Sequence, residues 1–260
     1  MDSPSQIYLE RCRVLLDHVA AQQQTIVSVA ELFARTIQKG RMVHAFGSGH
    51  SRILVEEMWP RYGSFPGFNP IVELSVTFHN LVVGANGQRQ AMFLENVSGL
   101  AERIVRNFHI TPDDAALVVS SSGCNTLPVE VAEEFRRRSV PVVAIVSSSH
   151  AEASASNHPR SLKLHEIADW VLDTGAPVGD AMVAIAGLDT PVAPGSTVGG
   201  VLLINAIKAE TARLLTEAGC PPLVLTAACV AGRERARQLF EAAYDEHSRR
   251  LARCFEHPGP

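Results

Sequence analysis

Residues 116–135, ALVVSSSGCNTLPVEVAEEF, combine a short apolar run with a loop of hydroxyl side chains and the start of a helix. The apolar run over 116–119 is typical of a buried parallel strand. The residues after it can direct O–H and N–H groups at an anion, and they are Ser120, Ser121, Ser122, Gly123, Asn125 and Thr126. A helix that starts after such a loop adds the positive end of its dipole. The stretch therefore predicts a phosphate-binding loop between a strand and a helix.

A second unit of strand, loop and helix lies upstream. The apolar run over 42–46 leads into a loop that consists of Gly47, Ser48, Gly49, His50 and Ser51, and a helical pattern follows over 53–58. A single Ser/Gly turn after a strand is ordinary connecting structure, because both residues are common in loops. Two such loops, each after an apolar strand, favour one shared binding site.

Composition excludes several classes of protein. The chain has 260 residues, of which 46% are hydrophobic, enough for a large core. Its formal net charge of −4 gives no electrostatic reason to expect nucleic acid as a partner. The first residues mix charged and apolar side chains, so we expect no signal peptide, no membrane span and a cytoplasmic location. The five cysteines lack CxxC spacing, which favours buried thiols over disulfides.

Hydrophobic periodicity divides the chain into alternating strands and helices. We expect strands over 42–46, 71–74, 115–120, 140–146 and 168–173. We expect helices over 3–39 (one or two), 91–108, 126–138, 197–218 and 232–255. The helix over 91–108 has one apolar face, formed by Phe93, Val97, Leu100, Ile104 and Val105.

The order of these elements predicts the fold class. The strand, helix and strand between 115 and 146 form a βαβ unit, which is the core of a parallel sheet. We expect a single domain over 1–260 with its core at about 36–229, built as an α/β three-layer sandwich around a five-stranded parallel sheet. The N-terminal helical segment 3–39 and the C-terminal helix 232–255 are additions to that core.

Four phrases resemble the sugar isomerase (SIS) domain of phosphosugar isomerases and phosphosugar-binding regulators. They are GSGHSRILVEEM, SSSGCNTLPVEVA, PVGDA and STVGGVLLINAIKAE, and the resemblance covers residues 3–229. Within that family they are most similar to a branch often labelled phosphoheptose isomerase. The resemblance implies a phosphorylated sugar as ligand and no cofactor. It also implies a homodimer or homotetramer with sites near the subunit interface.

The resemblance assigns roles to individual residues. It implies that the phosphate is held by Ser120, Ser121, Ser122, Asn125 and Thr126, and that Ser48 and Ser51 contact the ligand. An aldose–ketose isomerase moves a proton between C1 and C2 through an enediol, which needs a base and a second group that opens the ring. Related enzymes take a glutamate from the helix after the first loop, which fits Glu56 or Glu57, and another group from the last core helix, which fits Glu210. For each glutamate, a solvated helix carboxylate is the alternative.

The histidines add further candidates. His79 precedes a glycine-rich turn that could bring it to the same crevice, where it would be a catalytic group. His50 could face a bound sugar or turn to solvent, and His44 is expected inside a core strand. The irregular spacing of three more resembles no zinc site, so we expect no metal; these are His150, His158 and His165.

Other functions compete with an isomerase. Gly47 and Gly49 begin a dinucleotide-binding pattern that Glu73 could complete, but Arg52 stands where the third glycine belongs. A sensor that binds a sugar phosphate without chemistry needs no carboxylate near C1 and C2 of the sugar. A lyase-type etherase on a lactyl amino-sugar phosphate would use two glutamates and would add Glu95 to the candidates. Cys124 lies in the phosphate loop, but the sequence indicates no base for a nucleophilic thiol.

Overall fold

The centre of the protein is a five-stranded parallel sheet. The computed structural model describes residues 3–77 and 87–256. The strands are β1 (Val43–Gly47), β2 (Phe68–Ile71), β3 (Ala115–Val119), β4 (Val142–Val146) and β5 (Trp170–Asp173). Their order is β2-β1-β3-β4-β5, and every neighbouring pair is parallel. The connection from β1 leads to β2 on one side of it, and the connection from β2 leads to β3 on the other side. This reversal places a topological switch point between β1 and β3. Ligands of open α/β sheets bind at such a point, beyond the carboxyl ends of the strands.

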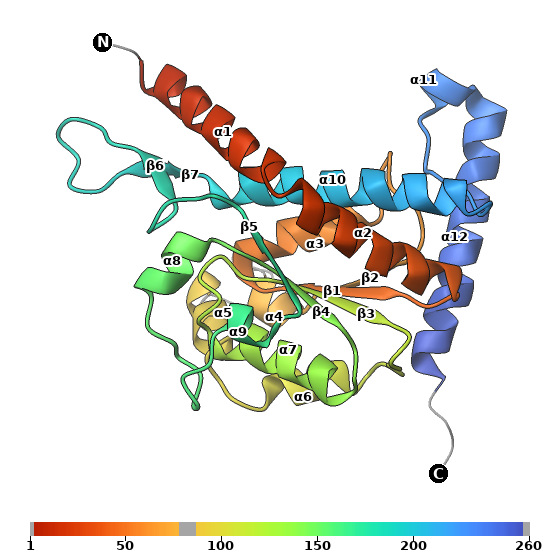
Figure 1. The fold of residues 1–260 in the computed structure, drawn as a ribbon, viewed down its shortest axis with the longest axis horizontal. Coiled ribbons are helices and arrows are strands. Elements are labelled where there is room, and N and C mark those ends of the chain that lie inside the picture. Colours follow the sequence, from red (N-terminus) through yellow and green to blue (C-terminus); the bar gives the residue numbers. More distant parts are fainter. Residues whose placement is uncertain (1–2, 78–86, 257–260) are drawn as a thin grey trace.

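Helices cover both faces of the sheet and make three layers (Figure 1). One face carries α2 (Gln23–Gln38), α3 (Arg52–Met58) and α10 (Ser196–Glu217). The other face carries α6 (Leu100–Val105), α7 (Thr126–Arg137) and α9 (Leu164–Ile167). Alternate residues of a strand point to opposite faces, so Leu117 packs in the first cluster and Val118 in the second. The expected three-layer α/β sandwich is therefore confirmed.

The remaining elements lie around this core. They are α1 (Pro4–Ala20), the 3₁₀ turn η1 (Gly49–Ser51), α4 (Leu74–Thr77), α5 (Gln88–Leu94), α8 (Ser148–Ala153), β6 (Ala181–Val183), β7 (Val192–Pro194), α11 (Ala228–Ala231) and α12 (Arg233–Phe255). The helix α12 packs where β1 begins, because Cys254 Sγ lies 3.5 Å from Met42 Sδ. Among the described helices, none combines the length and the apolar character needed to cross a membrane.

Asp114 holds together the amino ends of β1 and β3, at the edge of the sheet opposite the switch point. Its carboxylate accepts hydrogen bonds from Arg41 Nε at 3.0 Å and from the backbone N–H of Met42 at 3.2 Å. Burial alone would raise the pKa of Asp114, but the nearby His44 and Arg41 outweigh that effect and hold the pKa far below its usual value. The starts of β1 and β3 are therefore held together by an ionised carboxylate. As expected, His44 is fully buried, with Nδ1 2.9 Å from Asn69 Nδ2.

Several boundaries differ from the sequence-based expectation. The strand expected over 71–74 lies earlier, at Phe68–Ile71. The N-terminal segment forms two helices. The helix expected over 91–108 is also two, because Gly99 adopts a left-handed conformation (φ +88°) between α5 and α6. Two members of its expected apolar face are exposed, Phe93 at 70% and Val97 at 38%.

Two adjacent glycines let α10 approach the sheet. A Cβ on Gly199 would lie 2.0 Å from the carbonyl oxygen of Thr174, just beyond β5, and one on Gly200 would lie 2.2 Å from a methyl carbon of Leu54. Real Cβ atoms do not come this close to other atoms, so the backbone contact at Gly199 requires the absence of a side chain, whereas a Cβ at Gly200 would require the Leu54 side chain to move. The approach brings the first turn of α10 to the carboxyl edge of the sheet.

We expect Gly199→Ala to lower the free energy of unfolding by about 1–3 kcal/mol, because the methyl group meets backbone that cannot rotate away. Gly200→Ala is the matched control. There the obstacle is a side chain that can change rotamer, and the helix gains about 1 kcal/mol in propensity. Denaturant unfolding of both variants checks the order. A loss for Gly200→Ala as large as that for Gly199→Ala would contradict it.

Candidate functional site

A cavity of about 410 Å³ opens at the carboxyl ends of β1, β3 and β4. It contains residues from both serine-rich loops and from the first turn of α10. Of the expected binding residues, those that line it are Ser48, Gly49, His50, Ser51, Ser120, Ser121, Ser122 and Asn125. The two loops therefore form one site, at the switch point between β1 and β3.

The loop after β3 has one hydroxyl that its own fold does not use. Ser120 Oγ accepts a hydrogen bond from the backbone N–H of Gly123 at 3.1 Å, and Ser122 Oγ accepts one from Cys124 at 3.3 Å. These two hydroxyls shape the loop. Ser121 Oγ is buried with no hydrogen-bond partner, although the residue lines the cavity. Buried polar atoms are nearly always hydrogen-bonded, so this hydroxyl has an unused capacity to form a hydrogen bond.

The other three expected binding residues support the loops from behind. Gly47 lets the chain turn tightly, since a Cβ there would lie 2.8 Å from the carbonyl oxygen of Ser51. Gly123 takes a left-handed conformation with φ +61°. Thr126 is buried, and its hydroxyl donates to the carbonyl oxygen of Asn157 at 3.0 Å. None of these three is among the residues that line the cavity.

Glu95, at the end of α5, joins the two loops. Its carboxylate accepts a hydrogen bond from Ser48 Oγ at 2.7 Å and another from Asn125 Nδ2 at 2.8 Å. Its carbonyl oxygen also accepts the N–H of Leu127, in the first turn of α7, at 2.8 Å. Burial raises the pKa of Glu95, and the Ser48 hydrogen bond offsets this only in part. Glu95 lines the cavity, and a carboxyl group whose pKa is raised in such a position is suited to proton transfer.

The glutamates expected to be catalytic lie elsewhere in this chain. Glu57 accepts a hydrogen bond from Asn205 Nδ2 at 2.9 Å and pairs with Arg61. Burial would raise the pKa of Glu57, but these two partners and Lys208 lower it overall. Glu56 and Glu57 line a separate hollow beside Arg61. Glu210 pairs with Arg213 at 2.8 Å on α10. None of the three lines the cavity between β1 and β3, so their catalytic role stays a prediction. His79 lies outside the described residues.

Sequence reasoning missed several residues of the cavity wall. They are Gln88, Met92, His150, Thr174, Asp180, Ser196 and Thr197. One signal for His150 was available, because Ser147, Ser148 and Ser149 follow β4 just as Ser120, Ser121 and Ser122 follow β3. The carboxylate of Asp180 is engaged locally, since it accepts the N–H of Gly195 at 3.0 Å and the N–H and hydroxyl of Ser196. It thus caps the start of α10.

Cys124 has no sign of nucleophilic activation. Its thiol is buried and lies 3.1 Å from the carbonyl oxygen of Ser122. Burial raises the pKa of this thiol, which favours the protonated, unreactive form. The side chain therefore acts as a small packing group beneath the loop.

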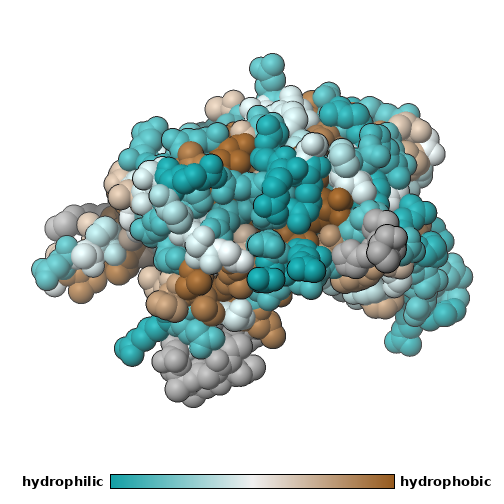
Figure 2. Space-filling view, turned by 90° about the horizontal axis from the view of Figure 1, so that it is seen from below, coloured by the Kyte–Doolittle hydropathy of each residue, from teal (hydrophilic) through white to brown (hydrophobic). Residues whose placement is uncertain are grey.

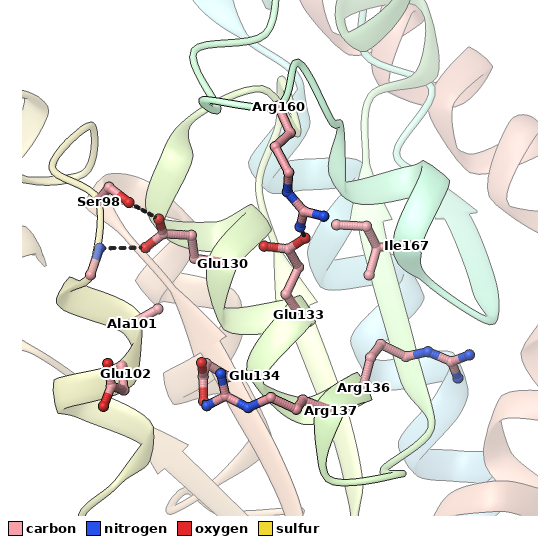
Figure 3. A pocket seen from close by; sticks show the side chains of 11 residues that line it. Ser98, Ala101, Glu102, Glu130, Glu133, Glu134, Arg136, Arg137, Arg160 and Ile167 are labelled. Carbon is pink, nitrogen blue, oxygen red and sulfur yellow. Dashed lines mark hydrogen bonds and ion pairs between the residues drawn. The ribbon is translucent and has the colours of Figure 1, made fainter.

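A larger hollow of about 610 Å³ lies between α6 and α7, on the mostly hydrophilic face seen in Figure 2. Figure 3 shows that Glu130 and Glu133 are already bonded to neighbouring groups of this hollow. Glu130 accepts the N–H of Gly99 at 2.8 Å and the hydroxyl of Ser98, and Glu133 pairs with Arg160. Glu134 likewise pairs with Arg137. We therefore take the cavity at the serine loops as the candidate functional site.

Comparison with known proteins gives the family. A family model described as the SIS domain matches residues 7–147, which is more than half of the chain. This chain belongs to the SIS domain family. A UPF0309 protein of Halalkalibacterium halodurans is 33% identical over 220 residues, which cover 85% of this chain and 88% of that protein. A UPF0309 protein of Brucella abortus is 32% identical over 94% of this chain and 95% of that protein.

A solved structure gives independent support for the fold. The phosphoheptose isomerase from Francisella tularensis superposes with a TM-score of 0.50 at 15% identity, over 81% of this SIS chain and 98% of that protein. At this identity the likeness shows the fold alone. It agrees with the five-stranded parallel sheet and its helical layers.

The raised pKa of Glu95 has a consequence for stability. The folded state holds this proton more tightly than the unfolded chain, whose carboxyl titrates near the ordinary value of 4.5. The associated stability is complete below that pH and is lost as the pH rises through the folded pKa. Glu95→Gln keeps a neutral group there. We expect the melting temperature of Glu95→Gln, relative to the parent, to increase between about pH 4 and about pH 8.

Thermal unfolding across this pH range measures the difference. Glu31→Gln, an exposed change on α2, is the control and should leave the difference from the parent constant. A Glu95→Gln difference that stayed flat, or that fell as the pH rose, would show that burial does not disfavour the Glu95 carboxylate.

Proposed function

We propose that this SIS protein binds a phosphorylated sugar in the cavity between β1 and β3 and interconverts its aldose and ketose forms. One observation carries the proposal: the unpartnered hydroxyl of Ser121 and the carboxylate of Glu95 share this cavity. A phosphate is satisfied by hydroxyl and backbone donors at a strand end followed by a helix. The fold-level likeness to a phosphoheptose isomerase is in keeping with that ligand class.

Proton transfer is the task that suits Glu95. With the phosphate at the loop after β3, the carbon chain of the sugar extends from that loop into the cavity and passes beside Glu95. Glu95 takes the proton from C2 of the open aldose, the C–H electrons form the C1=C2 bond, and the C1=O1 electron pair moves to O1, which gives an enediolate. The same carboxyl returns its proton to C1 while the hydroxyl proton on O2 passes to O1, which leaves a carbonyl at C2. No redox partner is required.

Two alternatives explain less of the site. A sensor has no need of a buried carboxylate with a raised pKa beside the sugar, whereas an isomerase depends on one. A two-glutamate etherase would also use Glu95. Among the described residues that line the cavity, however, Glu95 is the only glutamate.

We also propose that the protein self-associates. The helix α1 extends beyond the sheet (Figure 1) and exposes Leu9, Val14 and Leu16, each by 50% or more. Burying these side chains in a second copy would remove apolar surface from water. Such an assembly is also the arrangement in which Glu210 of one chain could approach the cavity of another.

Ser121→Ala tests the phosphate contact. The change removes a hydroxyl with no partner inside the protein, so the melting temperature should not fall. A hydrogen bond to a charged group contributes about 1.5–3 kcal/mol, so the Kd for sugar phosphates should rise by about tenfold to about a hundredfold. Calorimetry with hexose and heptose phosphates measures this, and the added Ser122→Ala change should abolish binding.

The matched control for this test is Ser98→Ala, a serine in the other hollow, which should leave the Kd unchanged. Unphosphorylated sugars control for the phosphate. Equal affinity of the parent and Ser121→Ala for every phosphorylated sugar that the parent binds would contradict the assigned phosphate position.

Glu95→Gln tests the base. We expect kcat to fall by about 10²–10⁴ with the Kd for the sugar phosphate preserved, because the amide keeps the shape of the site but cannot accept the proton. Isomer formation and solvent deuterium uptake at C1 and C2, followed by NMR, measure the loss. Glu57→Gln and Glu210→Gln are the comparison variants. Normal turnover in Glu95→Gln together with a loss in Glu210→Gln would move the base to Glu210.

A further inference from the structure

His150 is a polar side chain of the cavity wall that has no part in the proton transfer assigned to Glu95. It lies in α8, directly after the serine run that ends β4, and it lines the same cavity as Glu95. Its Nδ1 accepts a hydrogen bond from the backbone N–H of Gly179 at 3.1 Å. A ring nitrogen that accepts such a bond carries no proton, so the neutral ring has its proton on Nε2. The backbone of Gly179 thus selects one tautomer.

The segment that presents Gly179 is held on both sides. Ser147 Oγ and Ser149 Oγ both donate to the carbonyl oxygen of Ala176, at 2.7 and 3.0 Å. On the other side Asp180 is bound to Gly195 and Ser196 at the start of α10. The Gly179 N–H is therefore fixed relative to α8, and the His150 ring is oriented before any ligand arrives. Such preorganisation is what an electrostatic catalytic group needs.

The sheet order places His150 opposite Glu95. Glu95 is tied to Ser48 at the end of β1, whereas His150 follows β4, and β3 lies between these two strands. Neighbouring strands are about 4.8 Å apart, so the two strand ends are separated by about 10 Å. A sugar phosphate held by the loop after β3 would therefore lie between a carboxylate and an imidazole N–H.

We propose that His150 donates its Nε2 proton in a hydrogen bond to the carbonyl oxygen of the open sugar phosphate and stabilises the enediolate formed from it. This role rests on the isomerase function proposed above. As Glu95 takes the C2 proton, the C1=O1 electron pair moves to O1, and the negative charge develops next to Nε2–H. O1 gains a proton from Nε2, Nε2 regains one from the hydroxyl on C2, and Glu95 delivers its proton to C1. The ring ends as it began, and atoms and charge balance.

An anchoring role is the competing explanation, because His150 also binds Gly179. Two substitutions separate the roles. In His150→Asn the amide oxygen can take the place of Nδ1 and keep the bond to Gly179, but no donor remains at the place of Nε2. In His150→Gln the longer side chain can place an N–H donor near the position of Nε2. His150→Asn therefore keeps the acceptor for Gly179 and loses the donor to the substrate, whereas His150→Gln keeps the donor.

Turnover of a sugar phosphate by the two variants of the full chain decides between them. We expect His150→Asn to lower kcat by about 10²–10³ with little change in KM, the usual effect of losing one donor to a developing oxyanion. His150→Gln should retain at least about tenfold more kcat than His150→Asn. The reverse order, or equal kcat in the two variants, would overturn the proposal.

Inhibitor binding gives a readout that anchoring would not move. A phosphorylated hydroxamate mimics the enediolate, whereas a phosphorylated alditol has neither a carbonyl nor a developing charge. His150→Asn should weaken the hydroxamate by at least about tenfold and leave the alditol unchanged. Equal weakening of both ligands would show that His150 only holds the cavity wall, and would overturn the proposal.

These outcomes are distinct from failure of the proposed function. A parent protein that binds sugar phosphates but forms no isomer would overturn the isomerase function, and the role of His150 with it. A parent that turns over normally alongside a fully active His150→Asn would overturn the role of His150 alone.

Discussion

The carboxylate of Glu95, shared between Ser48 and Asn125, determines the geometry of the site. A carboxylate taken out of water requires hydrogen-bond donors, and here the two strand-end loops supply them. The same two bonds set the spacing between those loops and hold the end of α5 over the cavity. The position of α5 in turn explains why Phe93 is exposed, because the side of the helix that bears Ala91 and Glu95 faces inward.

The sheet separates stability from function along its strands. At the amino ends, Asp114 binds Arg41 and the backbone of Met42, and α12 covers the start of β1. At the carboxyl ends, hydroxyls and backbone groups surround an open cavity. Gly199 serves both stability and function, because only a glycine lets α10 pack closely enough on the sheet to bring Ser196 and Thr197 to the cavity. One face of the sheet thus contributes both core packing and part of the site.

The sequence was sufficient for the sheet, the two serine loops and the helices that follow them, because these features depend on local hydrophobic period and loop chemistry. It failed where the backbone conformation of a single residue or a distant contact decides. The path between α5 and α6 depends on the left-handed turn at Gly99, and the partners of Glu95 lie 47 and 30 positions away. His150 was weighed only as a zinc ligand for the same reason, since its contact with Gly179 involves a loop without any periodic pattern.

The charge of the cavity wall has a consequence for selectivity. Among the described residues that line the cavity, none is lysine or arginine, so the side-chain donors available to a ligand there are hydroxyl, amide and imidazole groups. Attraction by basic side chains is screened by dissolved ions within about 10 Å at 0.1 M salt, whereas short hydrogen bonds from neutral donors are hardly affected. Affinity for the phosphate group should therefore vary little with ionic strength. If the proposed site is correct, such a wall selects a ligand by the positions of its oxygen atoms more than by its charge.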